Sequence, residues 1–150
     1  MKRFIAIALL FGTLIVNAQE TTFKKFYKNH KEEATFSLNL PTFLVNGFID
    51  NDDIDKEILN KAVNFKMLVC ENKTQNISKD FKKFSKRNNL KTLIRAKDGK
   101  DKMNLYFLEE GDFINEIIMV VEGDGDESVF MGLKTKKLTK DELVAFIAEK

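Results

Sequence analysis

The sequence is poor in the residue types on which metal binding and nucleophilic catalysis usually depend. It contains one histidine, one cysteine and no tryptophan. Cys70 has no partner for an intramolecular disulfide, so the fold must rest on its apolar core, and such a cysteine is typically a buried packing residue. His30 and Cys70 stand 40 residues apart, which is not a zinc-site spacing. A Ser-His-Asp triad is equally unsupported, because His30 falls on an apolar helix face beside Phe23 and Phe26.

Other catalytic motifs are also absent. The sequence has no GxSxG nucleophile elbow, no Walker-type phosphate loop and no GxGxxG dinucleotide motif. We therefore predict no cofactor. Two carboxylates can hydrolyse a glycosidic bond without a histidine, but no pair stands out among the 23 acidic residues. A hydrolase that uses carboxylate chemistry remains an alternative function.

The first 18 residues have the order of a secretory signal peptide. Lys2 and Arg3 precede an apolar run over residues 4–16, and Val16-Asn17-Ala18 is a small-residue cleavage signature. The run is shorter than the roughly 20 residues that a permanent membrane-spanning helix needs. We predict a signal peptide at 1–18 and one exported domain at 19–150, located in the periplasm or outside the cell. No cysteine stands at the cleavage site, where Gln19 is the next residue, so a lipid anchor is not expected.

Removing this leader makes the chain neutral by formal count. The leader carries two of the 25 basic residues and none of the acidic ones, so 23 of each sign remain. A neutral exported domain has no global electrostatic attraction to nucleic acid. The basic run KDFKKFSKRNNLK is interpreted as the solvated side of a helix whose Phe81 and Phe84 face inward. Contact of this run with anionic lipid stays open; a nucleic-acid partner is not predicted.

Helical spacing of apolar residues recurs in four places in the first half of the domain. The segments are 23–30, 41–49, 54–62 and 78–88. Asp52 or Asp53 is the predicted N-cap of the third helix and Ser78 that of the fourth, which Asn88-Asn89 ends.

Two strands are expected between these helices. Residues 64–71 read as a buried strand. Residues 35–40 alternate between apolar and polar, which favours a strand. The alternative, a helix start with Ser37 as cap and Pro41 in the first turn, stays open at this point.

The second half predicts four strands and a final helix. Strand-like runs at 90–96, 103–109, 113–122 and 128–135 are separated by short glycine-bearing turns, which require antiparallel neighbours in a meander. Residues 117–121 are apolar on both faces, so this strand should be central and covered by helices on at least one side. Thr139 with Glu142 forms a capping box, and Leu138 with Leu143 a hydrophobic staple.

Two acidic clusters raise the question of calcium. An EF-hand loop started at Asp124 places Val129 where glycine must turn, and one started at Asn51 places Lys56 there. Neither loop fits. An irregular weak calcium site remains the second alternative, with candidate ligands Asp124, Asp126, Asp52 and Asp53. The segment EGDGDESV is otherwise interpreted as a hairpin tip.

These features predict an α+β domain: an antiparallel meander of about four strands, extended by up to two N-terminal strands, with helices packed on it. The early Phe-rich helix and the ending SVFMGLKTKKLTKDELVAFI, a strand with Gly132 followed by a helix, resemble domain of unknown function 4252. Many members of that family look like lipoproteins, and this chain departs by lacking the lipobox cysteine. The resemblance implies no activity, catalytic residue or cofactor.

The expected function is therefore that of an exported, non-enzymatic protein that binds another envelope component through a sheet face or a sheet edge. An enzyme should instead show a concave pocket in which two or more acids converge. A binding protein should show an exposed apolar patch or an unpaired strand edge.

Overall fold

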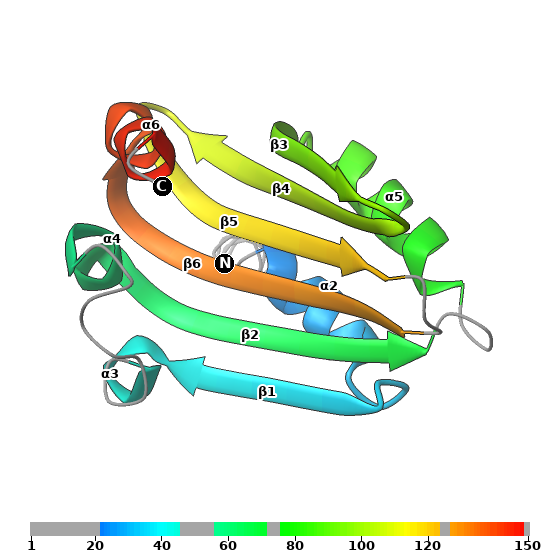
Figure 1. Ribbon diagram of the computed structural model, residues 1–150. Helices are drawn as coiled ribbons and strands as arrows, with labels where there is room; N and C mark the ends of the chain where they lie inside the picture. The colour runs from blue at the N-terminus through cyan, green and yellow to red at the C-terminus, as the bar shows by residue number, and fades with distance from the viewer. Residues whose placement is uncertain (1–21, 46–55, 72–75, 124–126, 149–150) are drawn as a thin grey trace, which may run out of the picture.

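The chain forms one six-stranded antiparallel sheet with helices packed against it, in a computed structural model that describes residues 22–45, 56–71, 76–123 and 127–148 (Figure 1). The strand order is β1-β2-β6-β5-β4-β3. The elements are, in chain order, α2 Thr22–His30, β1 Phe36–Pro41, α3 Thr42–Val45, α4 Lys56–Lys61, β2 Ala62–Glu71, α5 Ile77–Arg87, β3 Lys91–Asp98, β4 Asp101–Glu110, β5 Phe113–Glu122, β6 Glu127–Thr139 and α6 Lys140–Ala148. The predicted α+β class is confirmed.

The C-terminal meander of β3, β4, β5 and β6 is also confirmed, and two N-terminal strands extend it. β2 pairs antiparallel with β6, and β1 pairs with β2 at the sheet edge. The ambiguous segment before Pro41 is therefore a strand, and Pro41 is its last residue instead of a first-turn helix residue. Gly99 and Gly111 both have a φ of +60° in the turns that join β3 to β4 and β4 to β5. That conformation is easily reached only by glycine.

The two faces of the sheet are covered differently. Figure 1 shows α2 and α5 behind the sheet, while α4 and α6 lie at the left end, where β6 ends and β5 begins. Successive side chains of a strand point to opposite faces. Each strand of the centre therefore contributes to two separate apolar clusters, one on each side.

The first cluster joins α2 and α5 to the sheet and contains most of the buried aromatic rings. Phe26 is at its centre, with ring centroids 5.4 Å from Phe81 and 5.5 Å from Phe130. Cys70 is fully buried here, and burial raises the pKa of its thiol to about 11, which fits the predicted packing role. The buried members are Phe23, Phe26, Tyr27, Leu68, Cys70, Ile77, Phe81, Ile118, Val120 and Phe130.

Helix α2 is fixed to the sheet at its first turn by two contacts. The backbone N–H of Phe23 donates to the carboxylate of Glu116, with N–O distances of 3.1 and 3.3 Å. Glu116 is buried, and a carboxylate at a helix N-terminus is favoured by the helix dipole. The ring of Phe23 lies against Gly132 of β6, where an added Cβ would come within 2.7 Å of Phe23 Cε1 and closer still to Cδ1. Gly132 is therefore required by close packing.

The second cluster lies on the opposite face, at the end covered by α4 and α6. Its buried members are Ile58, Ile114, Leu138 and Leu143. The predicted capping box is present: Glu142 N–H donates to Thr139 Oγ1 at 3.2 Å, and Thr139 N–H donates to Glu142 Oε2 at 2.9 Å. Lys61 forms an ion pair with Glu142, which joins α4 to α6.

One predicted cap is wrong. Helix α5 begins at Ile77 with Asn76 as N-cap, so Ser78 lies inside the first turn. The reason is that the Asn76 carbonyl accepts the Asp80 N–H at 3.0 Å, and this bond starts the helix two residues before Ser78 could cap it. The predicted end is confirmed, because Asn88 is the C-cap and Asn89 has a φ of 53°. Asp52 and Asp53, predicted to cap α4, lie outside the described residues.

We expect Thr139→Ala to lower the free energy of unfolding by about 1 kcal/mol, because the Glu142 N–H loses its acceptor at the start of α6. Chemical denaturation followed by circular dichroism measures this loss. Thr35→Ala, at an exposed position just before β1, is the matched control and should change stability by less than about 0.5 kcal/mol. Equal stability of the Thr139 variant and the wild type would contradict the role of the cap.

Gly132→Ala should lower the free energy of unfolding by about 1–3 kcal/mol, because the new methyl group overlaps the Phe23 ring. A double-mutant cycle isolates this contact. In a Phe23→Ala background, the same Gly132→Ala change should be neutral or stabilising, since alanine is preferred over glycine in a strand by roughly 0.5–1 kcal/mol. Additive losses in the double mutant would show that the glycine is needed for another reason.

The ion pairs of Glu109 and Glu142 predict a dependence of stability on pH. Hydrogen bonds from Lys140 and then Lys91 lower the pKa of Glu109, and a hydrogen bond from Lys61 followed by one from the Thr139 backbone lowers the pKa of Glu142. Because both carboxyls titrate lower in the folded chain, their stabilisation is fully present above the ordinary value of 4.5 and is lost as pH falls through the lowered values.

The melting temperature should therefore decline as the pH falls below about 4.5, and Glu109→Gln with Glu142→Gln should make that decline shallower. Thermal melts between pH 7 and pH 2 measure the effect. Glu71→Gln, an exposed residue at the end of β2, serves as the control. If the double variant follows the wild-type curve at every pH, these pairs do not contribute.

Candidate functional site

The face of the sheet opposite α2 and α5 is apolar along its whole width. Two rows of side chains cross all six strands on this face, and we call these twelve residues the open face. The methionine row, in strand order, is Leu38, Met67, Met131, Met119, Leu105 and Ile94, and the valine row is Phe36, Val69, Val129, Val121, Met103 and Ala96.

The alternation of the strands fixes the direction of these side chains. Leu68, Phe130 and Val120 are register partners that are buried under α2 and α5. Their chain neighbours in β2, β6 and β5 must point to the other side of the sheet. The twelve residues therefore form one continuous surface without a charged or hydrogen-bonding side chain.

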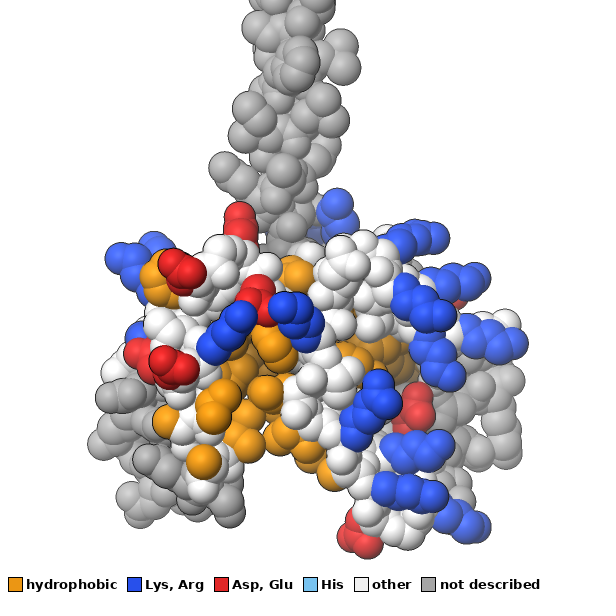
Figure 2. Space-filling view, turned by 90° about the horizontal axis from the view of Figure 1, so that it is seen from above, with side chains coloured by type: hydrophobic (Ala, Val, Ile, Leu, Met, Phe, Trp, Pro, Cys, Tyr) orange, Lys and Arg blue, Asp and Glu red, His pale blue; other side chains and the backbone are white. Residues whose placement is uncertain are grey.

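No described helix buries the open face. Its side chains are half-buried or exposed, with Phe36 at 49 % exposure, and none of them belongs to either apolar cluster. Helices α4 and α6 cover only the adjoining end, over Leu133, Ile117 and Phe107. Figure 2, which has the open face toward the bottom of the view, shows hydrophobic side chains gathered in the middle above a hollow in the outline.

Methionine is concentrated on this surface. The sequence has five methionines, and all except Met1 belong to the open face. Met67, Met131 and Met119 are direct neighbours on three adjacent strands. Methionine side chains are flexible and polarisable, and are over-represented at surfaces that adapt to a bound partner.

The sheet edges are less suited to binding than this face. The edge strand β3 carries Lys91, Arg95 and Lys97 among its eight residues, and charged side chains discourage strand addition. The other edge strand, β1, has six residues and ends in Pro41, which has no N–H to donate. Of the two binding modes expected from the sequence, the sheet face is therefore the better supported.

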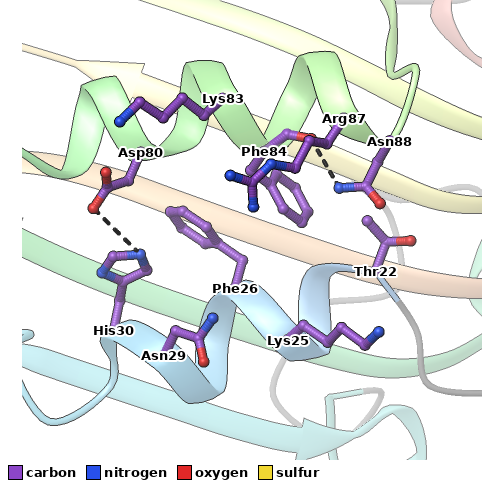
Figure 3. Close-up of a pocket in the computed structure, with 10 residues that line it drawn as sticks. All are labelled: Thr22, Lys25, Phe26, Asn29, His30, Asp80, Lys83, Phe84, Arg87 and Asn88. Atoms are coloured by element: carbon purple, nitrogen blue, oxygen red, sulfur yellow. Dashed lines mark hydrogen bonds and ion pairs between the residues drawn. The ribbon is translucent and has the colours of Figure 1, made fainter. Parts of the chain in front are cut away.

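A concave region of about 580 Å³ lies between α2 and α5 (Figure 3). Lys25, Lys83 and Arg87 line it, above the rings of Phe26 and Phe84. Asp80 is the sole carboxylate among its described lining residues, and it faces His30 at 3.9 Å. The convergence of two acids that would identify a carboxylate hydrolase does not occur in this cavity.

His30 is half-buried at the end of this cavity, as the helical spacing predicted. Its ring lies 4.5 Å from that of Phe26, and Glu33 is 3.8 Å from Nδ1, too far for a hydrogen bond. Within the described residues, neither a serine nor a cysteine lines the cavity beside it. Thr22 carries the one hydroxyl among the described lining residues, and Figure 3 shows it at the opposite end of the cavity from His30.

The buried charges near α2 also serve the fold. Glu116 accepts the Phe23 N–H. Burial, followed by the positive charge of Lys24, lowers the pKa of Lys66, whereas the negative charge of Glu116 acts to raise it. Lys66 donates to the Asn64 side chain. The Glu116 carboxylate therefore holds the start of α2 against the sheet.

Metal binding finds no support in the part of the chain that the structure describes. No group of three or more His, Cys, Asp or Glu side chains is placed to hold an ion there. The calcium candidates Asp124, Asp126, Asp52 and Asp53 all lie outside the described residues, so that hypothesis stays untested. Among the described helices, none is both long and apolar enough to cross a membrane.

Part of the signal for the open face was visible in the sequence, because residues 117–121 are apolar at every position. In β5 and β6, apolar residues occupy both alternating positions, as in Val129-Phe130-Met131. Such strands need cover on two sides, and the described helices supply it on one side and at one end of the other. The mismatch becomes visible only when the strand order is known.

The features described above extend over almost the whole described chain, from the first turn of α2 to the capped helix α6. Neither a curated protein nor a solved structure is significantly similar to it. A family match covers residues 26–146. The chain therefore belongs to the family described as domain of unknown function (DUF4252), as the resemblance implied.

Proposed function

We propose that the protein is exported to the cell envelope and acts there without catalysis, by binding another envelope component through the open face. The observation that supports this most strongly is the apolar surface of two complete side-chain rows, which none of the described helices covers. Large contiguous apolar patches are rare on the surfaces of monomeric soluble proteins, and they commonly mark interaction sites.

The physical basis of binding would be the hydrophobic effect. Each half-exposed methionine, valine or leucine still has apolar area in contact with water, and removing it stabilises a complex by about 25 cal/mol per Å². None of the twelve side chains is charged, so an apolar partner would not have to displace water from charged groups there.

Export is supported by the order of charged, apolar and small residues over 1–18. Export fits the binding proposal because the envelope contains many apolar surfaces. A domain without a disulfide can remain folded there if its apolar core is large enough to stabilise it. The two aromatic and aliphatic clusters supply that core.

Site-specific photocrosslinking in living cells tests the proposal. A photoreactive phenylalanine analogue at Met119, in the centre of the open face, should give discrete adducts in the envelope fraction. The same analogue at the exposed Lys82 of α5 is the control and should give none. The processed chain should begin at Gln19 when analysed by mass spectrometry.

Absence of adducts at Met119, or equal adducts at Lys82, would overturn binding through the open face. An unprocessed chain in the cytoplasm would overturn export. The two parts of the proposal can therefore fail separately.

A further inference from the structure

We propose that the outer side of α2 and α5 binds the surface of an anionic phospholipid bilayer. This inference goes beyond the proposed function, because it assigns a role to the side of the sheet that the open face does not use. The distribution of charge, the lack of ion pairs and a cationic cavity each support it.

Positive charge is concentrated on these two helices. They contain eight of the 23 lysines and arginines that follow the predicted leader, and Asp80 is their one acidic residue. The helices therefore carry an excess of seven positive charges, and the rest of residues 19–150 carries the same excess of negative charges. We call the eight cations the basic layer; they are Lys24, Lys25, Lys28, Lys79, Lys82, Lys83, Lys86 and Arg87.

The basic layer forms one surface that points away from the sheet. The apolar residues of α2 and α5 are buried against the strands, and the cations occupy the other side of each helix, where all except the half-buried Lys24 are exposed. The two helices lie side by side, since the Phe26 ring of α2 is 5.4 Å from Phe81 and 5.1 Å from Phe84 of α5. Their outer sides are therefore continuous.

Most of the basic layer lacks a carboxylate partner. Six of its members form no ion pair with a described residue: Lys25, Lys79, Lys82, Lys83, Lys86 and Arg87. Within α5, Lys79 and Lys83, Lys82 and Lys86, and Lys83 and Arg87 are spaced i,i+4, where like charges destabilise a helix.

The needs of the fold do not account for this cluster. The helix dipole favours Lys86 and Arg87 in the last turn of α5, but it disfavours Lys79 in the first. A helix that is only solvated usually mixes both signs of charge on its exposed side. An anionic surface would relieve the repulsion that the folded chain retains here.

The cavity between the helices gives the basic layer a place for a phosphate group. Figure 3 shows Lys25 of α2 on one wall and Lys83 and Arg87 of α5 on the other. A guanidinium binds two phosphate oxygens at once, and an ammonium acts as a compact positive charge. Asp80 faces His30 at one end of the cavity. The three cations can therefore surround the phosphate of a lipid headgroup.

The character of the surface favours lipid over nucleic acid. Proteins that bind single strands stack the bases on exposed aromatic rings. Here Phe26 and Phe81 are buried and Phe84 is half-buried, so the basic layer has no aromatic platform. Seven of its eight cations are lysines, which are typical of polybasic segments that bind anionic bilayers. Export, if it occurs, also places the chain beside lipid headgroups and away from nucleic acid.

The same charge distribution would orient the domain. An anionic surface attracts the basic layer and repels the acidic remainder of the chain. Since α2 and α5 lie behind the sheet in Figure 1, the open face on the other side would be directed away from the lipid. Both surfaces could therefore be used at the same time.

Cosedimentation with lipid vesicles tests the inference. The processed chain, purified from the envelope fraction, should bind vesicles that contain about 30 % phosphatidylglycerol and should not bind pure phosphatidylcholine vesicles. Raising sodium chloride from about 50 mM to about 500 mM should weaken binding at least ten-fold, because salt screens exposed charges.

Matched variants locate the contact. Lys83→Glu with Arg87→Glu should weaken vesicle binding at least ten-fold, and Lys83→Gln with Arg87→Gln at least three-fold. Lys136→Glu with Lys137→Glu is the control, because it changes the net charge of the chain equally at two exposed positions near the end of β6; it should stay within two-fold of the wild type. Circular dichroism establishes that each variant is folded, and the glutamine pair replaces the glutamate pair if that one unfolds.

Each contrary outcome identifies a different error. Equal binding to phosphatidylcholine, or a loss in Met131→Gln with none in the α5 variants, would overturn the basic layer as the contact. An equal loss in the Lys136 and Lys137 control would reduce the effect to net charge. Tighter binding of a short DNA duplex than of vesicles at the same salt would replace lipid with a soluble polyanion, and salt-sensitive dimers without vesicles would replace it with a second copy.

The crosslinking test of the open face stays independent of this result. A lipid that reacts at Lys82 adds the mass of one lipid only, which a gel distinguishes from the discrete protein adducts expected at Met119. Loss of vesicle binding would leave the open-face proposal standing, and absence of adducts at Met119 would leave the basic layer standing.

Discussion

The attachment of α2 to the sheet is the contact on which the rest of the structure depends. A buried carboxylate on β5, Glu116, accepts the backbone N–H of Phe23 in the first turn of the helix, and the Phe23 ring lies where Gly132 of β6 has no side chain. These contacts bring α2 close enough for Phe26 to reach α5 and the sheet centre at once.

Helices α2 and α5 bury one face of the sheet, and no described helix covers the middle of the other face in the same way. The strands β2, β5 and β6 present apolar side chains in both directions, so burial of one direction leaves the other as a surface of similar character. Helices α4 and α6 bury the end of that surface, and the capping box with the Lys61 pair holds them in place. What remains is bordered by α4 and α6 at one end, and none of its twelve side chains is charged.

Local features were predictable from the sequence, and features that depend on distant pairing were not. The Thr139 capping box involves residues three apart, and the meander follows from short turns, so both were confirmed. The Ser78 cap was wrong because a backbone bond from Asp80 to Asn76 competes with it, and composition does not decide that competition. The open face requires knowing that β2 pairs with β6, whose sequence separation is about 60 residues, and loop closure over such a distance leaves no local pattern.

The alignment of Met67, Met131 and Met119 has a chemical consequence beyond packing. A thioether is readily oxidised to a sulfoxide, which replaces a soft apolar group with a strong dipole. Buried sulfurs are shielded from this reaction, whereas these three side chains are only half-buried. Oxidants would therefore change the chemistry of the surface at three adjacent points before they disturbed the aromatic core, and a bound partner would shield the sulfurs as it covered them.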